Sequence, residues 1–136
     1  MTHRLYTWFK LSVAIGWTIF LSILLLQPSA QPVINTGVQG APPSFERELL
    51  FSTGHVLTFG FTFLLWCWAL ALRIQWQLVA LCAVLMLYGV LAEQVQSTVP
   101  GRSAQWWDML ANGLGVLIAY GAWHAYERFD AKSYVN

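Results

Sequence analysis

Long apolar runs dominate the chain and alternate with short polar segments. Each run is close to the roughly 20 residues that a helix needs to cross about 30 Å of hydrocarbon. Backbone groups inside lipid must be hydrogen-bonded within the segment, so runs of this kind are expected to be helices. The pattern predicts an all-α bundle of four transmembrane helices, at about residues 8–26, 49–72, 76–94 and 107–124.

Composition supports a membrane environment for the whole chain. Of the 136 residues, 57% are hydrophobic and only 10% are charged, whereas a soluble domain carries about 25% charged residues. The mean hydropathy is +0.55. We therefore predict a single transmembrane domain over residues 1–136. The net charge of +1 includes no basic tract, so we expect no binding of nucleic acid.

Basic residues next to the apolar runs predict the orientation of the helices. Two lie on one predicted side, Arg47 and Arg102, and five lie on the other, namely Arg4, Lys10, Arg73, Arg128 and Lys132. Cytoplasmic loops carry the excess of basic residues. Both termini are therefore expected in the cytoplasm, with outer loops at 27–48 and 95–106.

Polar residues of three helices and one loop are expected to meet near the outer face. An ionisable group inside a span costs at least about 2.5–3.5 kcal/mol and usually faces the bundle interior, where it is paired. Helical spacing places several such groups on inward faces. The candidates are Ser52 and His55 in the second helix, Glu93 and Gln96 in the third, Arg102 in the loop, and Asp108 and Asn112 in the fourth.

These residues allow two interpretations. As a functional site, His55, Glu93 and Asp108 would be catalytic acids and bases or ligands of a hard cation. Arg102 would bind a phosphate oxygen as a bidentate fork, with Ser52, Gln96 and Asn112 as further ligand-binding groups. As a structural feature, the same groups would only satisfy one another across the helices. The whole set favours a site.

No resident metal or cofactor is predicted. Cys67 and Cys82 lie in apolar runs, and there is no Cys/His cluster or paired-histidine spacing of the kind that binds zinc or haem. The glycines of the last three helices are expected to allow close helix approach. Gly113 and Gly115 would equally open room for a ligand.

A motif in the second half of the chain resembles the VanZ-like family. Residues 93–102 read EQVQSTVPGR and are followed by Asp108, Asn112 and Gly115. The family pattern is E-x-x-Q, then P-x-R or P-G-R, then D-x-x-x-N-x-x-G. His55 and Phe59 match its H-x-x-x-[YF]. The resemblance covers about residues 10–122.

The chain departs from the family pattern at two places. Members commonly carry an Asp-Lys pair before the histidine, where this chain has Phe51 and Ser52, and an acid or serine where it has Gln105. If that Asp belongs to a reactive centre, this chain would bind without catalysing, unless Glu48 replaces it.

The resemblance implies a multi-pass protein of the bacterial inner membrane with a role like that of a teicoplanin-resistance protein. The leading hypothesis is an outward pocket for an amphiphile with an anionic head, such as a lipid-linked cell-wall precursor. The second is an intramembrane hydrolase or transferase that uses Glu93, Asp108 and His55. The third is a structural subunit that binds another membrane protein or a second copy of itself.

Overall fold

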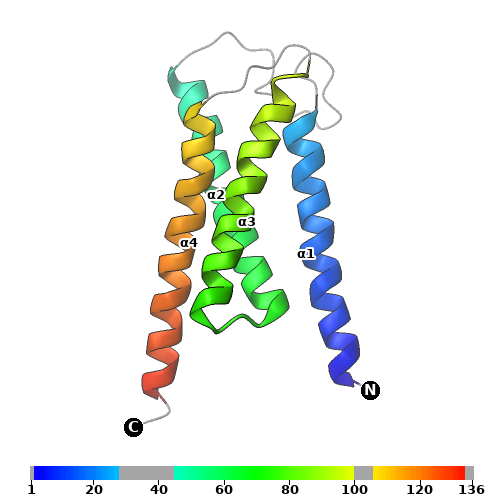
Figure 1. Cartoon of the computed structure of the whole chain (residues 1–136), viewed down its shortest axis with the longest axis vertical. Coiled ribbons are helices and arrows are strands. Elements are labelled where there is room, and N and C mark those ends of the chain that lie inside the picture. The colour runs from blue at the N-terminus through cyan, green and yellow to red at the C-terminus, as the bar shows by residue number, and fades with distance from the viewer. Residues whose placement is uncertain (1, 28–44, 100–105, 134–136) are drawn as a thin grey trace.

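The structure is a computed structural model that describes residues 2–27, 45–99 and 106–133, and these residues form helices and turns without a strand. The helices are α1 (Thr2–Leu26), α2 (Phe45–Leu70), α3 (Gln75–Gln96) and α4 (Trp106–Ser133). They form one elongated bundle (Figure 1). We call the end where α1 begins and α4 ends the terminal end, and the opposite end, where α2 and α4 begin, the distal end.

Three of the four helices are apolar enough to cross a membrane, over Arg4–Leu26, Glu48–Leu70 and Gln75–Gln96. The outer surfaces of the bundle expose large apolar side chains, including Trp8, Ile19, Leu57, Val84 and Leu117. A helix of a soluble bundle would present polar residues there. The all-α fold and the membrane character that the sequence predicts are thus confirmed.

The fourth helix is less apolar than the others. It carries Asp108 and Asn112 near its beginning, and His124, Glu127 and Arg128 near its end. That α4 also crosses the membrane, with both termini in the cytoplasm, stays a prediction. The helices also extend past the apolar runs, since α2 begins at Phe45 and α4 continues to Ser133.

A tight turn joins α2 to α3 at the terminal end. Ala71 adopts a left-handed conformation with φ of 51°, and the backbone N–H of Leu72 donates to the carbonyl of Cys67 at 3.1 Å. Left-handed residues commonly end helices in this way, although the position usually belongs to glycine. The turn holds α2 and α3 antiparallel.

The apolar core runs through the middle of the bundle and its terminal end, and it reaches the distal end at Leu25 and Ala92. It joins aromatic and aliphatic side chains of all four helices, so that no single pair of helices forms the core alone. Its members include Leu21, Leu25, Phe59, Phe63, Cys67, Leu78, Cys82, Leu85, Val116 and Ala119.

Two tryptophan–threonine hydrogen bonds attach α1 to α2. Trp17 Nε1 donates to Thr62 Oγ1 at 2.9 Å, and Trp66 Nε1 donates to Thr18 Oγ1 at 3.1 Å. Each threonine hydroxyl donates in turn to a carbonyl one turn earlier in its own helix. The hydroxyl lone pairs are therefore left to accept from the indoles.

Glycine allows α2 and α4 to touch backbone to backbone. A Cβ atom on Gly115 would lie 2.2 Å from the carbonyl oxygen of Val56, and one on Gly60 would lie 3.0 Å from the carbonyl oxygen of Gly115. Small residues allow such close approach of membrane helices. The contact lies one residue after His55 and three after Asn112, so it sets the register of the polar residues.

Candidate functional site

Polar side chains from α2, α3 and α4 converge near the distal end of the bundle. Buried among them are His55, Glu93, Gln96 and Asn112, with exposed fractions of 6%, 1%, 2% and 1%. Asp108 stands in the first turn of α4 with 15% of its side chain exposed. The packing of α2, α3 and α4 thus brings groups from residues 52 to 112 of the chain into one layer.

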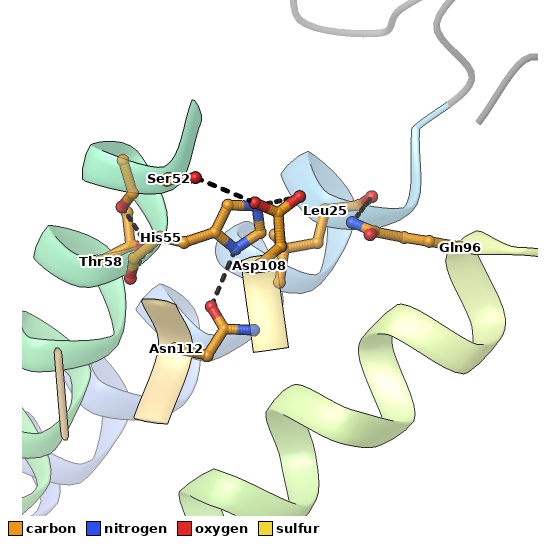
Figure 2. A network of polar contacts seen from close by, with 8 residues as sticks. Leu25, Ser52, His55, Thr58, Gln96, Asp108 and Asn112 are labelled. Carbon is orange, nitrogen blue, oxygen red and sulfur yellow. Dashed lines mark hydrogen bonds and ion pairs between the residues drawn. The ribbon is translucent and has the colours of Figure 1, made fainter. Parts of the chain in front are cut away.

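The imidazole of His55 lies between two residues of α4 (Figure 2). Its Nδ1 is 2.8 Å from Asn112 Oδ1 in a buried contact. Because an amide oxygen only accepts hydrogen bonds, Nδ1 is the donor. The other ring nitrogen, Nε2, faces Asp108 Oδ2 at 3.7 Å, which is longer than a hydrogen bond. Asn112 therefore orients the ring and leaves Nε2 directed at the carboxylate.

Ser52 reaches the same carboxylate from one turn earlier in α2. Its hydroxyl donates to Asp108 Oδ1 at 3.4 Å (Figure 2). The aspartate rather than the histidine is the middle member of this chain of contacts. A serine nucleophile activated by histidine needs the histidine between the serine and the aspartate, so the arrangement does not resemble a Ser-His-Asp triad.

Glu93 completes a three-residue group. One ligand atom each of His55, Glu93 and Asp108 lies within 4.8 Å of the others. The three residues that we predicted as catalytic are therefore neighbours. Two carboxylates and an imidazole at this spacing are able to share a proton or a cation.

Gln96 has a different position from the other predicted ligand-binding residues. Its Nε2 donates to the carbonyl of Leu25 at 2.8 Å (Figure 2), so its hydrogen bond holds the last turn of α1. The carbonyls at a helix end lack partners within their own helix. This contact gives Gln96 a structural role, and that role explains why its side chain is buried. Arg102 lies outside the described residues.

Asn112 also contacts α3. A Cβ atom on Gly89 would lie 3.1 Å from both Cβ and Nδ2 of Asn112, so glycine makes room for the amide between α2 and α3. Among the residues that the structure describes, Nδ2 has no hydrogen-bond partner. Nearly all buried polar groups are hydrogen-bonded, and this donor is therefore available to a bound molecule.

An apolar groove of about 1140 Å³ begins beside the polar residues. It runs past Ser52 and Val56 of α2, Met86 and Val90 of α3, and the exposed face of α4 around Gly113. No Cβ contact within 4 Å would arise at Gly113. Ser52 belongs to the groove and also bonds Asp108, so the groove and the polar residues meet at this hydroxyl.

Sequence reasoning missed the groove and the contacts of Leu25 and Gly89. Most groove residues are ordinary apolar residues, whose pattern resembles any lipid-facing surface. The only signal was Gly113, for which the sequence allowed either helix packing or room for a ligand. The open space at Gly113 agrees with the second alternative, whereas Gly115 serves the first.

The fold and this buried polar layer define a small helical membrane protein with a polar site near one end. The sequence model of the family described as VanZ/LLP1 matches residues 5–127. The chain belongs to this family, as the motif between Glu93 and Gly115 predicted. No curated protein and no solved structure matches the chain.

Proposed function

We propose that this VanZ/LLP1 protein lies in the bacterial inner membrane and binds an amphiphile with an anionic head group. The hydrocarbon chain would occupy the groove, and the head would enter the polar layer at Ser52, His55 and Asp108. The observation that carries the proposal is the position of Ser52, which lines the groove and hydrogen-bonds Asp108. A molecule with an apolar tail and a polar head matches that junction.

The groove has the length of one leaflet's hydrocarbon. Its lining on α4 extends from Trp107 to Leu117, which is about 15 Å at 1.5 Å per residue. Half of a bilayer core is also about 15 Å thick. A lipid standing in the outer leaflet would thus place its head group beside the first turn of α4.

The orientation of the bundle supports an outward-facing site. Arg4 and Lys10 of α1, Arg128 of α4 and Arg73 in the α2–α3 turn all lie toward the terminal end, and the positive-inside rule predicts that this end faces the cytoplasm. Lys10 there donates to the carbonyl of Trp68 at 3.2 Å. The polar layer at the distal end would then face the cell envelope, where lipid-linked cell-wall precursors are the candidate ligands.

The anionic character of the head group rests on Arg102. It follows Glu93 and Gln96 in the family motif, and its guanidinium is suited to a phosphate oxygen. Glu48, Glu93 and Asp108 are all acidic, so an anionic head group would be repelled unless a cation lay beside it. We therefore propose Arg102 as the cation that offsets this repulsion.

Native mass spectrometry of the protein taken from its own membrane tests the proposal. Gly113→Leu adds a side chain to the groove where nothing lies within 4 Å, and Gly16→Leu makes the same change in α1, also into open space. Lipid that survives detergent exchange should be lost from Gly113→Leu and kept by Gly16→Leu. Arg102→Ala should lose anionic lipids selectively. Equal lipid in all the proteins would contradict the proposal and favour a structural subunit.

A second candidate function is a transferase or hydrolase, and the fixed orientation of His55 favours it. Asn112 accepts from Nδ1, which leaves Nε2 as the proton acceptor next to Asp108 and Glu93. This hypothesis predicts turnover of the co-purifying lipid that fails in Asp108→Asn while thermal stability is kept. Equal turnover by both proteins would exclude that role for Asp108.

A further inference from the structure

We infer that His55, Glu93 and Asp108 bind a divalent transition-metal cation of the Mn²⁺ and Zn²⁺ class. The inference departs from the expectation, drawn from sequence spacing, that the protein holds no metal. Its basis is that ligand atoms of these three residues all lie within 4.8 Å of one another. Each ligand comes from a different helix, so no metal-binding spacing motif marks the set, although the sequence allowed these three residues as ligands of a hard cation.

The distances suit a cation at the centre of the group. Ligands at about 2.0–2.2 Å from such an ion lie roughly 3–4.4 Å apart, depending on the angle between them. The separation of 3.7 Å between His55 Nε2 and Asp108 Oδ2 falls within this range. The largest separation, at most 4.8 Å, needs only a small rotation of one side chain.

The contact between His55 and Asn112 is a second, independent observation. Metal-bound histidines almost always donate their other ring N–H to an acceptor, which fixes the tautomer and directs the free lone pair at the ion. Asn112 Oδ1 is that acceptor, at 2.8 Å from Nδ1. The lone pair of Nε2 consequently faces Asp108. A lone pair opposite a carboxylate is repulsive unless a proton or a cation lies between them.

The unfilled donor of Asn112 points to a further group at the same place. The side chain is 1% exposed, and Nδ2 lacks a hydrogen-bond partner among the described residues. Three protein ligands leave at least one coordination position open for water or substrate. An oxygen bound there would accept a hydrogen bond from this amide.

Charge gives the energetic reason for a cation. Glu93 and Asp108 are two carboxylates near the distal end of the bundle, and a buried charge must be paired or must coordinate a metal. One imidazole with two carboxylates is a ligand set between the oxygen-rich sites of Mg²⁺ and Ca²⁺ and the nitrogen- and sulfur-rich sites of Cu²⁺. This chemistry selects Mn²⁺ or Zn²⁺.

A cation would explain how an acidic layer accepts an anionic head group. This consequence rests on the proposed function, since it requires a ligand that enters from the groove. An oxygen of the head group would fill the open coordination position. The cation site itself does not depend on the lipid.

Titration with Mn²⁺ after chelator treatment tests the inference on the full chain in lipid nanodiscs. Free Mn²⁺ is followed by electron paramagnetic resonance. We expect about one ion per chain in the wild type, and affinity lowered more than about 100-fold in Glu93→Gln and Asp108→Asn. Glu46→Gln is the matched control, because Glu46 is exposed at the beginning of α2. Zn²⁺ should displace the bound Mn²⁺.

Pulsed electron paramagnetic resonance of Mn²⁺ bound to the wild type tests the inference even where a variant fails to fold. The wild-type signal should contain nitrogen coupling from one imidazole. Asn112→Leu should lower the affinity by about 10–100-fold, and Asn112→Asp should restore it, because a carboxylate still accepts from Nδ1. No saturable binding by the wild type, or bound Mn²⁺ without nitrogen coupling, would overturn the inference.

The cation and the lipid are distinguished by Gly113→Leu. This variant should keep the ion and lose the lipid. A protein that binds lipid without a cation would overturn the metal site and leave the proposed function standing. A wild-type protein that binds Mn²⁺ but keeps no lipid through detergent exchange would support the metal site alone.

Discussion

The two ends of the bundle are held together by different chemistry. At the terminal end, α2 and α3 bury Phe63, Cys67 and Leu78 in an apolar core. At the distal end, the same two helices bury His55 and Glu93. Apolar packing thus joins these helices at one end, whereas ionisable groups lie between them at the other. The difference is the main structural argument that the distal layer has a function.

The largest effect is expected at the α2–α4 crossing, which both ends share. Gly115→Ala would place a Cβ atom 2.2 Å from the carbonyl oxygen of Val56. The helices must separate, and we expect a loss of unfolding free energy of about 3 kcal/mol or more. Reversible unfolding in mixed micelles with increasing SDS measures it. Gly113→Ala, on the same helix in open space, should be neutral or slightly stabilising, and equal losses in both would contradict the packing argument.

Removal of a core side chain at the terminal end should affect stability alone. Phe63 is fully buried, and Phe63→Ala is expected to cost about 3 kcal/mol through the cavity that it leaves. Occupancy by lipid and by Mn²⁺ should be unchanged in the folded protein. The same unfolding assay, combined with native mass spectrometry, measures both properties. Loss of ligand from the folded variant would show that the two ends are coupled.

At the distal end, we expect the opposite result: replacing both members of a polar pair should remove the ligand and leave the stability nearly unchanged. Asn112→Leu leaves His55 Nδ1 without its acceptor and should cost about 1–3 kcal/mol, whereas His55→Phe together with Asn112→Leu should come close to the wild-type stability. Replacement of buried polar pairs by apolar side chains is often neutral. A double-mutant cycle in the unfolding assay gives the coupling. The double variant should also lose the ligand, and a large additive loss of stability would instead favour a structural role for the layer.

The smallest effect is expected in the α2–α3 turn. Ala71 has a φ of 51°, a conformation that glycine adopts without a steric cost. Ala71→Gly should raise the unfolding free energy by about 0.5–1 kcal/mol and leave ligand binding unchanged. Ala69→Gly, in the last helical turn of α2, should instead lower it by about the same amount. A destabilised Ala71→Gly variant would mean that the turn relaxes when it is free to do so.

The fold was largely predictable from the sequence, and the motif predicted the family. Apolar runs of about 20 residues have only one stable conformation in lipid, so the helices followed from composition and length. That α4 crosses the membrane was harder to predict from hydropathy. Its Asp108 and Asn112 lower the apolar average, yet they are turned toward the interior of the bundle.

The candidate site was predictable in part. Spacing along a helix places Asp108 and Asn112 on one face, because residues four apart are neighbours on any helix. Spacing does not say that they flank His55, or that Gln96 turns to Leu25 instead. The roles of these residues in catalysis or binding stay predictions.

The sequence by itself determined that this chain is a helical membrane protein of the VanZ/LLP1 family, and that its polar residues lie near the ends of its helices. The reason is that hydrophobic length and helical periodicity act locally. Only the tertiary structure decided which faces meet. The backbone contact between Gly115 and Val56 sets the register of α2 and α4, and a shift of one residue would turn His55 about 100° away from Asp108.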